Sequence, residues 1–207
     1  MELRVHRIPF STNVERVALA LGHKGLSVQW VDVDPADRRA LVALSGQDLV
    51  PVLEAGDEVV ADSTAILAWL DARYPDPPLW PQEPAARARA DIAVAWFNEV
   101  WKRAPNAIDD ELDEERPDAA VLAGLSGQIA ATLPWFEALL DGSDFLLGDR
   151  LGVLDVVAFP FLKYGVVAPD AGDPERFHTI LHEHLPVAGR LPRLHAWVAR
   201  VDALPRA

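Results

Sequence analysis

The chain has 207 residues, of which 50% are hydrophobic and 25% charged, and it carries a formal net charge of −13 without any cysteine. A chain of this length can bury a large core, so it needs no disulfide or structural metal for stability. The negative charge is spread along the sequence and would repel a phosphate backbone, so we expect no nucleic-acid partner. Without cysteine, any thiol chemistry must use a thiol supplied by a ligand.

The sequence carries no obvious targeting or membrane segment. No run of about 20 apolar residues stands out as a span, and the N-terminus lacks the apolar core of a signal peptide. No low-complexity stretch indicates disorder. We therefore expect an ordered cytoplasmic protein with no membrane partner.

The first third of the chain alternates between strand and helix patterns. Apolar residues at Leu3, Val5 and Ile8 predict a strand, and the stretch 28–33 predicts another. Between them, residues 13–24 predict a helix that Gly25 ends as its C′ residue. A connection of this length suits a helical crossover, so the two strands should lie parallel.

The next segment predicts a weak helix over 35–44, followed by two antiparallel strands that turn around 55–57. Asp62 and Ser63 are good N-cap residues for a helix that continues to Tyr74. The run 75–84 then holds five prolines in ten residues, which is incompatible with a helix or a central strand. We place a domain boundary in this run.

Beyond the proline-rich run, apolar residues recur at helical spacing. The sets are Ile92, Trp96 and Val100; Leu122, Leu125, Ile129, Leu133 and Phe136; and Leu194, Trp197, Val198 and Val201. This period predicts a helical bundle. We therefore expect an α/β domain at 1–77, a linker at 78–84 and an all-α domain at 85–207.

Ser11 lies at the predicted start of the first helix. Thr12, followed three residues later by Glu15, has the spacing of a capping box, which places the helix start near Asn13. A hydroxyl just before a helix faces the positive end of its dipole, a setting that stabilises an anion such as a thiolate. The alternative, that Ser11 only helps to cap the helix, stays open.

Two further features have both a functional and a structural interpretation. Pro51 opens a predicted strand and indicates a turn, a cis bond or an edge strand, and a cis bond would present the Val50 main chain to an extended ligand. Asp62 and Ser63 combine a carboxylate with free N–H donors, which can hold an amino-acid zwitterion. They can equally serve as a helix cap alone.

Together these elements resemble the glutathione S-transferases, serine-type, over the whole chain. The resemblance rests on S-T-N-V-E-R-V from Ser11, V-P-V-L from Val50, the D-S pair at 62 and 63, and the proline-rich linker before a helical half. GDRLGVLDVVAFPFL resembles the family's buried helix, with Asp155 as its signature acid, and PRLHAWVARV resembles the closing helix. The resemblance implies a thioredoxin-like N-terminal domain that binds glutathione, followed by an all-α bundle.

The resemblance also implies roles for individual residues. Ser11 would donate a hydrogen bond to the glutathione thiolate, and the Val50 and Pro51 main chain would pair with the cysteinyl unit. Asp62 and Ser63 would hold the γ-glutamyl end. The expected glutathione site comprises Ser11, Thr12, Asn13, Arg39, Gln47, Val50, Pro51, Asp62 and Ser63; the expected pocket for an apolar electrophile comprises Phe10, Trp96 and Trp101.

The sequence departs from the family pattern at two places. Gly152 replaces the usual Ser or Thr N-cap three residues before Asp155, so the side-chain half of that capping box is lost. Leu49 stands where the family often has a basic or amide residue, and it cannot bind the glycyl carboxylate. Gln47, Arg38 and Arg39 lie near enough in sequence to replace it.

Aromatic residues and histidines allow simpler interpretations as well. Trp96, Phe97, Trp101 and Ile108 have the helical spacing of core residues. His178, His182 and His184 include a pair four residues apart, yet no HExxH motif accompanies them, so we expect a solvated helix end and no metal.

Three functions remain open on this fold. The first is a detoxifying glutathione transferase that works as a homodimer. The second is a glutathione-dependent isomerase or dehalogenase, and the third is a non-catalytic binding or assembly module. Thiol–disulfide reduction is disfavoured, because Ser11 stands in place of the cysteine that the omega-like and beta-like branches use.

Overall fold

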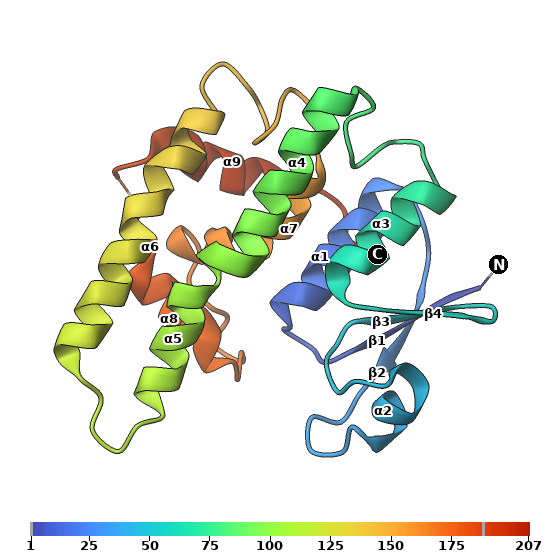
Figure 1. The fold of residues 1–207 in the computed structure, drawn as a ribbon, viewed down its shortest axis with the longest axis horizontal. Coiled ribbons are helices and arrows are strands. Elements are labelled where there is room, and N and C mark those ends of the chain that lie inside the picture. The colour runs from blue at the N-terminus through green and yellow to red at the C-terminus, as the bar shows by residue number, and fades with distance from the viewer. Residues whose placement is uncertain (1, 188) are drawn as a thin grey trace. The chain divides into compact units, whose positions relative to one another are not determined.

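The computed structural model describes residues 2–187 and 189–207 and divides into two compact units. The first unit comprises the chain up to Trp80 together with Leu204–Ala207, and the second comprises Pro81–Ala203. In Figure 1 the first unit runs from blue to green, apart from its last four residues at the red end of the chain, and the second runs from green to red. The last four residues therefore cluster with the first unit, whereas the sequence analysis places them in the helical domain. The other predicted boundaries stay predictions.

The first unit is built on a mixed four-stranded sheet with the order β2-β1-β3-β4. β1 and β2 are parallel, as the crossover argument predicts, with Val5 opposite Trp30. β3 pairs antiparallel with β1 and with β4. The strands are β1 (Leu3–Arg7), β2 (Gln29–Asp32), β3 (Val52–Ala55) and β4 (Glu58–Ala61).

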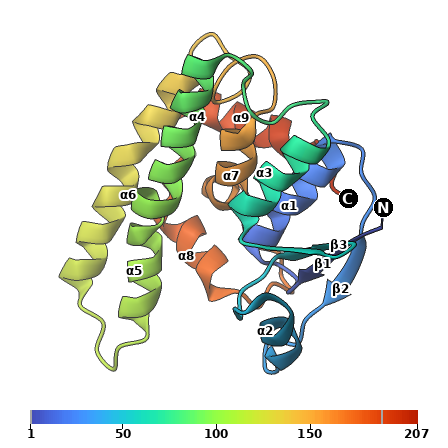
Figure 2. The same cartoon turned by 45° about the vertical axis from the view of Figure 1, so that its right-hand side comes forward.

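Three helices cover this sheet: α1 (Thr12–His23), α2 (Arg39–Ser45) and α3 (Ser63–Arg73). α1 and α3 contact each other and lie on one face of the sheet, while α2 lies on the other (Figures 1 and 2). The core between sheet and helices is apolar and closed to solvent, and it includes Val5, Val17, Leu53, Ile66 and Leu70. Gly25 follows α1 with φ 63°, which fits the predicted C′ role.

A buried ion pair ties the proline-rich run to the first unit. The Lys24 side chain is 0% exposed, and its Nζ lies 2.9 Å from Asp71 Oδ1. The same ammonium donates to the carbonyls of Tyr74 and Pro77. Asp71 in turn accepts hydrogen bonds from the main-chain N–H groups of Leu79 and Trp80. The run up to Trp80 is thus fixed by polar contacts that its own sequence does not reveal.

The residues after the last helix lie against α1. The Ala207 N–H donates to the Ala18 carbonyl at 3.2 Å, and Arg206 pairs with Glu15 at 3.2 Å. A Cβ at Gly22 would lie 2.1 Å from the Pro205 carbonyl oxygen. Glycine at this position therefore allows the close approach of residues 204–207, which we call the C-terminal strap.

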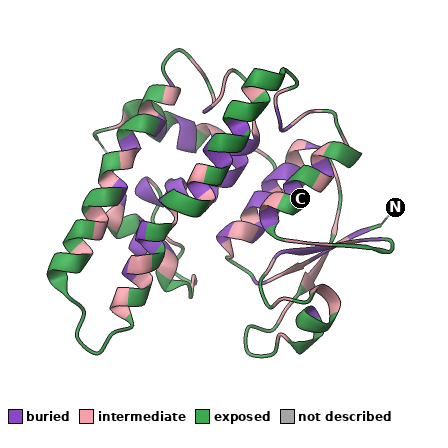
Figure 3. Cartoon of the chain, in the orientation of Figure 1, coloured by how far each residue is buried: buried purple, intermediate pink, exposed green. Residues whose placement is uncertain are grey.

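The regular elements of the second unit, over its described residues, are all helices, as the period of its apolar residues predicts. A π-helical turn at Phe97–Trp101 joins its first two helices, and a 3-10 turn at Lys163–Gly165 follows the central one. Every residue of the central helix, α7, is buried (Figure 3). The helices are α4 (Pro84–Trp96), α5 (Arg103–Leu112), α6 (Ala119–Leu139), α7 (Val153–Leu162), α8 (Arg176–His184) and α9 (Pro192–Asp202).

Asp155 anchors the buried helix α7 by its side chain. Its carboxylate accepts hydrogen bonds from the N–H groups of Leu146 and Gly152, both at 2.9 Å, and from the Trp197 indole at 2.7 Å. The Asp155 half of the capping box is therefore kept, and only the half that needs a side chain at Gly152 is lost, as the sequence predicts. Burial raises the pKa of Asp155 to about 6, while these hydrogen bonds lower it.

The apolar residues that recur along α4 and its π-helical turn, Ile92, Trp96 and Val100, lie on an exposed face and not in the core. Ile92 is 70% exposed and Val100 51%, and Trp96 is half-buried against the exposed Trp135 of α6. The core side of this segment is formed by neighbours one position away, among them Phe97, which is 0% exposed. Helical spacing alone identifies a stripe but not the direction that it faces.

α6 corrects the expectation about membrane segments. Its 21 residues are long and apolar enough to cross a bilayer, and only 17% of the apolar window is buried. The sequence analysis missed it because Ser126, Gln128 and Thr132 divide its apolar residues into short runs. A single helix of this kind is weak evidence for a membrane span.

Candidate functional site

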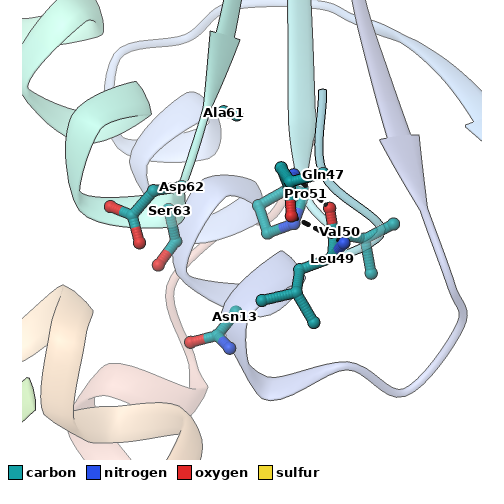
Figure 4. Close-up of a pocket in the computed structure, with 8 residues that line it drawn as sticks. All are labelled: Asn13, Gln47, Leu49, Val50, Pro51, Ala61, Asp62 and Ser63. Atoms are coloured by element: carbon teal, nitrogen blue, oxygen red, sulfur yellow. Dashed lines mark hydrogen bonds between the residues drawn. The ribbon is translucent and has the colours of Figure 1, made fainter. Parts of the chain in front are cut away.

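A cavity of about 240 Å³ lies in the first unit, at the end where α1 and α3 begin. It lies among the beginning of α1, the segment before β3, and the junction of β4 with α3 (Figure 4). Its lining combines an apolar wall with several polar groups. The residues that line it are Asn13, Gln47, Leu49, Val50, Pro51, Ala61, Asp62 and Ser63. Six of these belong to the glutathione site that the sequence predicts, and the exceptions are Leu49 and Ala61.

Ser11 is the N-cap of α1, and the predicted capping box is wrong. The Ser11 hydroxyl oxygen accepts a hydrogen bond from Val14 N–H at 3.4 Å, and the helix begins at Thr12. Glu15 pairs instead with Arg206. Thr12 is buried. Because a hydroxyl has one hydrogen and two lone pairs, capping leaves the Ser11 proton available to a ligand. Neither Ser11 nor Thr12 lines the 240 Å³ cavity.

Two residues near the starts of α1 and α3 have strained backbones. Among the described residues, the only non-glycine positions with positive φ are Phe10, at 67°, and Asp62, at 76°. Phe10 precedes Ser11, and Asp62 is the N-cap of α3. Side chains disfavour this region, and such strain is concentrated at functional sites. No signal in the sequence marks Phe10 as strained.

The Val50–Pro51 bond is cis, one of the possibilities that the sequence raised. The edge-strand interpretation is wrong, because β3, which begins at Val52, lies between β1 and β4. Pro51 therefore lies just before a central strand. At that place its missing N–H does not interrupt the hydrogen bonds of the sheet. In Figure 4, Val50 and Pro51 lie across the cavity from Asp62 and Ser63.

Asp62 and Ser63 form the polar corner of the cavity. Asp62 Oδ1 caps α3 by accepting hydrogen bonds from Thr64 N–H at 2.8 Å and Ala65 N–H at 3.0 Å. The capping interpretation of this residue is thus confirmed. Ser63 is 3% exposed and accepts a hydrogen bond from Arg16 Nη1 at 3.2 Å. Nothing in the helical pattern of α1 indicates that Arg16, a charged residue, faces inward, so its place at the site could not be predicted from the sequence.

Asn13 lines the same cavity. Its side-chain Oδ1 is buried and has no hydrogen-bond partner in the part of the chain that the structure describes. A buried polar atom of this kind is costly unless something satisfies it.

Three residues could bind the glycyl carboxylate in place of Leu49, and the side chains of all three already form hydrogen bonds or ion pairs with residues near them in sequence. Gln47 donates to the Leu49 carbonyl at 2.7 Å and accepts from its N–H at 2.6 Å. Arg38 donates to the carbonyls of Pro35 and Asp48. The Arg39 side chain is 90% exposed and pairs with Asp37. Gln47 alone among the three lines the cavity, and Arg39 does not.

The three aromatic residues assigned to an electrophile pocket differ in exposure. Phe10 is 46% exposed, and Trp96 is half-buried against Trp135, with 4.8 Å between ring centroids. Trp101 is 3% exposed and donates its indole N–H to Thr132 Oγ1 at 3.0 Å. Trp101 is therefore a core residue, and its burial favours the packing interpretation.

The solvated helix end expected for the histidines holds only in part, because His182 is exposed and His184 half-buried, whereas His178 is buried. His178 is 2% exposed, and its Nδ1 lies 2.5 Å from Asp173 Oδ2. His182 contacts the Tyr164 carbonyl, and His184 contacts Ser126 Oγ. The three rings thus have separate partners. Over residues 2–187 and 189–207, no group of three His, Cys, Asp or Glu side chains is placed to hold a metal ion.

A thioredoxin-like unit with a cavity at its cis-proline, followed by an all-helical unit, defines the class of protein. Two family models match this chain: the glutathione S-transferase N-terminal domain over residues 5–78 and the C-terminal domain over residues 84–200. The chain therefore belongs to the glutathione S-transferase family.

Individual relatives agree with this assignment. The chain is 30% identical over 168 residues to the glutathione S-transferase GstB of Escherichia coli K12, with 73% of this chain and 77% of the relative covered. It is 28% identical over 179 residues to FtsZ-localized protein A of Caulobacter vibrioides, covering 79% and 77%. A glutathione S-transferase of Methylobacterium radiotolerans, solved with glutathione sulfonate, shares the fold at TM-score 0.78 and 24% identity, covering 100% of this chain and 96% of the other.

Proposed function

We propose that this protein is a cytoplasmic glutathione S-transferase that activates the glutathione thiol for attack on an apolar electrophile. The observation that carries the proposal is the cavity in which Asn13, Val50, Pro51, Asp62 and Ser63 meet. Its size and its mixed polar and apolar lining suit a small peptide whose backbone needs hydrogen bonds. The relative solved with glutathione sulfonate supports this choice of ligand.

In this proposal each part of the glutathione molecule has its own partner. The cysteinyl unit pairs with the main chain at Val50, and the γ-glutamyl end lies at Asp62 and Ser63. Asn13 Oδ1 accepts a donor from the ligand, and Gln47 lies nearest to the glycyl end. Thr12 supports the beginning of α1 from within the core, and Arg39 is left with a peripheral role. Phe10, which is 46% exposed and precedes Ser11, offers apolar surface to the electrophile, and the assignment of Trp96 to the same pocket stays a prediction from the sequence.

Ser11 is the proposed catalytic residue. Its hydroxyl donates to the sulfur and favours the ionised thiol, and it does not act as a base because its own proton is too tightly held. A hydrogen bond to a charged group contributes about 1.5 to 3 kcal/mol, and one pKa unit corresponds to about 1.4 kcal/mol. The hydrogen bond would thus lower the pKa of the thiol by about one to two units, from about 8.5 towards neutrality.

Calorimetric titration with glutathione tests the proposal directly. Asp62→Ala should remove most of the binding, because it loses the carboxylate that holds the ligand ammonium. Ser11→Ala should keep most of the affinity but lose the thiolate absorbance of the complex and about 10- to 100-fold in transfer rate. No binding at millimolar glutathione would contradict the proposed function.

Two other functions are possible on this fold. The fate of glutathione and the effect of Ser11→Ala distinguish them from a transferase. An isomerase or dehalogenase would return glutathione unchanged at the end of its cycle, whereas a transferase consumes one molecule per product. A non-catalytic binding or assembly module is the other alternative, and the similarity to FtsZ-localized protein A, which is named for its localization with another protein, is the observation that keeps it in view. That module would show no turnover and no change in behaviour when Ser11 is replaced by alanine.

A further inference from the structure

Arg16 is a charged residue placed in the interior of the first unit. It lies on α1 and is 2% exposed, among the largest fully buried side chains of the described chain. Burial lowers the pKa of Arg16 to about 9, while the charge of Asp62 raises it, so the guanidinium remains protonated at neutral pH. A buried charge is costly, and a purely structural role would be served as well by an apolar side chain of similar volume.

The guanidinium contacts the cavity through Ser63. Arg16 Nη1 donates to Ser63 Oγ at 3.2 Å, and Ser63 lines the cavity wall. A serine hydroxyl has two lone pairs and one hydrogen. Because Arg16 occupies a lone pair, the hydroxyl hydrogen remains for another acceptor, so Ser63 faces a ligand as a hydrogen-bond donor.

Asp62 gives the same corner a negative charge. Its carboxylate lines the cavity next to Ser63 and attracts a ligand ammonium, but it repels a ligand carboxylate. The positive charge of Arg16, behind Ser63, offsets that repulsion. One anionic and one cationic group, with a donor between them, match the two charges of an α-amino-acid end.

We propose that Arg16 is a positioning residue that makes the Asp62–Ser63 corner selective for a ligand end bearing an α-carboxylate beside an ammonium. It acts through Ser63, whose hydroxyl it orients, and through its charge. The inference rests on the function proposed above, because the γ-glutamyl end of glutathione is such a group.

The test compares two ligands and four forms of the protein. The ligands are glutathione and 4-aminobutanoyl-cysteinyl-glycine, which is glutathione without the α-carboxylate. The proteins are the unmodified chain, Arg16→Gln, Ser63→Ala and Arg206→Gln as a matched control. Arg206 pairs with Glu15 on α1 and does not line the cavity. Calorimetry gives each affinity, and thermal unfolding shows that each variant is folded.

Arg16→Gln should weaken glutathione binding by about 10- to 100-fold, the loss expected for a charge-assisted contact, and leave the analogue within about twofold. Ser63→Ala should show the same selectivity loss, and Arg206→Gln should change neither affinity. If Arg16→Gln does not fold, Arg16→Lys takes its place and should lose about 3- to 10-fold for glutathione alone, because lysine keeps the charge but not the planar geometry.

Two other outcomes have different meanings. If a folded Arg16 variant weakens both ligands by the same factor, or neither, the inference is overturned while the proposed function stands. If the unmodified protein binds no glutathione at millimolar concentration, the proposed function fails and the inference fails with it.

Discussion

At the scale of single residues, two of the buried ionisable side chains, Arg16 and Asp155, are not evident from sequence spacing. Arg16 lies inside the first unit beside Ser63, and Asp155 lies inside the second, fully enclosed. Sequence patterns assign charged residues to surfaces by default. Asp155 was identified only through the family resemblance, and Arg16 was not identified at all.

Asp155 should make the stability of the protein depend on pH in mildly acidic solution. Its pKa rises from 3.8 to about 6 in the folded chain, chiefly through burial. Between these values the folded state holds a proton that the unfolded state has released, so the free energy of unfolding falls as the pH rises through this window. Two pKa units correspond to about 3 kcal/mol.

Denaturant unfolding of the wild type and Asp155→Asn at several pH values measures this contribution. The stability of the wild type relative to Asp155→Asn should decrease from pH about 4 to pH about 6 and then level off. Asp57→Asn, in the exposed turn between β3 and β4, serves as the control. A relative stability that does not change with pH would show that the folded-state pKa of Asp155 is not raised.

At the scale of elements, most of the fold of the first unit could be predicted from sequence. The parallel pair β1 and β2, the hairpin of β3 and β4 and the N-cap at Asp62 follow from local alternation, connection length and cap chemistry. The start of α1 was misplaced by one residue, because Ser11 and Thr12 are both good caps and tertiary packing buries Thr12. The orientation of the α4 stripe could not be predicted, because spacing does not say which side meets a neighbour.

The same limit applies to the candidate site. Val50, Pro51, Asp62 and Ser63 could be assigned to one site only through the family resemblance, because the local backbone and cap signals of each also allow a purely structural role. The internal hydrogen bonds of Gln47 and the exposure of Arg39 depend on loop geometry, which the sequence does not reveal.

The pair of Lys24 and Asp71 should be essential for the attachment of the proline-rich run. Lys24→Met leaves Asp71 buried without its cation, and removing one member of a buried pair typically costs about 3 to 5 kcal/mol. Urea unfolding measures the loss. The double variant Lys24→Met with Asp71→Asn should recover part of it, because no charge is then left uncompensated.

An exposed ion pair provides the contrast. Arg39→Met removes the surface pair with Asp37, and it should leave the unfolding midpoint almost unchanged, because solvent screens such pairs. Equal losses for Lys24→Met and Arg39→Met would contradict the structural role assigned to Lys24.

At the scale of the whole molecule, we propose a two-fold symmetric dimer, the commonest closed assembly of identical chains. An apolar stripe of Ile92, Trp96 and Val100 along α4 and its π-helical turn, beside Trp135 of α6, is exposed on the second unit. Contiguous apolar surface of this kind is expected to be covered by a partner, and a second copy of the chain is the partner proposed here.

Sedimentation of the wild type should give the mass of two chains. Ile92→Glu combined with Val100→Glu should shift it towards one chain, because a charge would have to be desolvated at the interface. Val167→Glu, at an exposed position outside α4 and α6, should have no effect. A wild type that sediments as one chain at micromolar concentration would contradict the dimer.

The C-terminal strap also bears on how the protein can be divided. Residues 204–207 belong to the first unit although about 120 residues of the second unit separate them from it along the chain. A fragment cut within the proline-rich run would lose the hydrogen bond to Ala18 and uncover the groove at Gly22. Truncation after residue 80 therefore does not give the complete first unit. A circularly permuted chain, in which the strap is joined to the N-terminal end of residues 2–80, would keep all of its parts together.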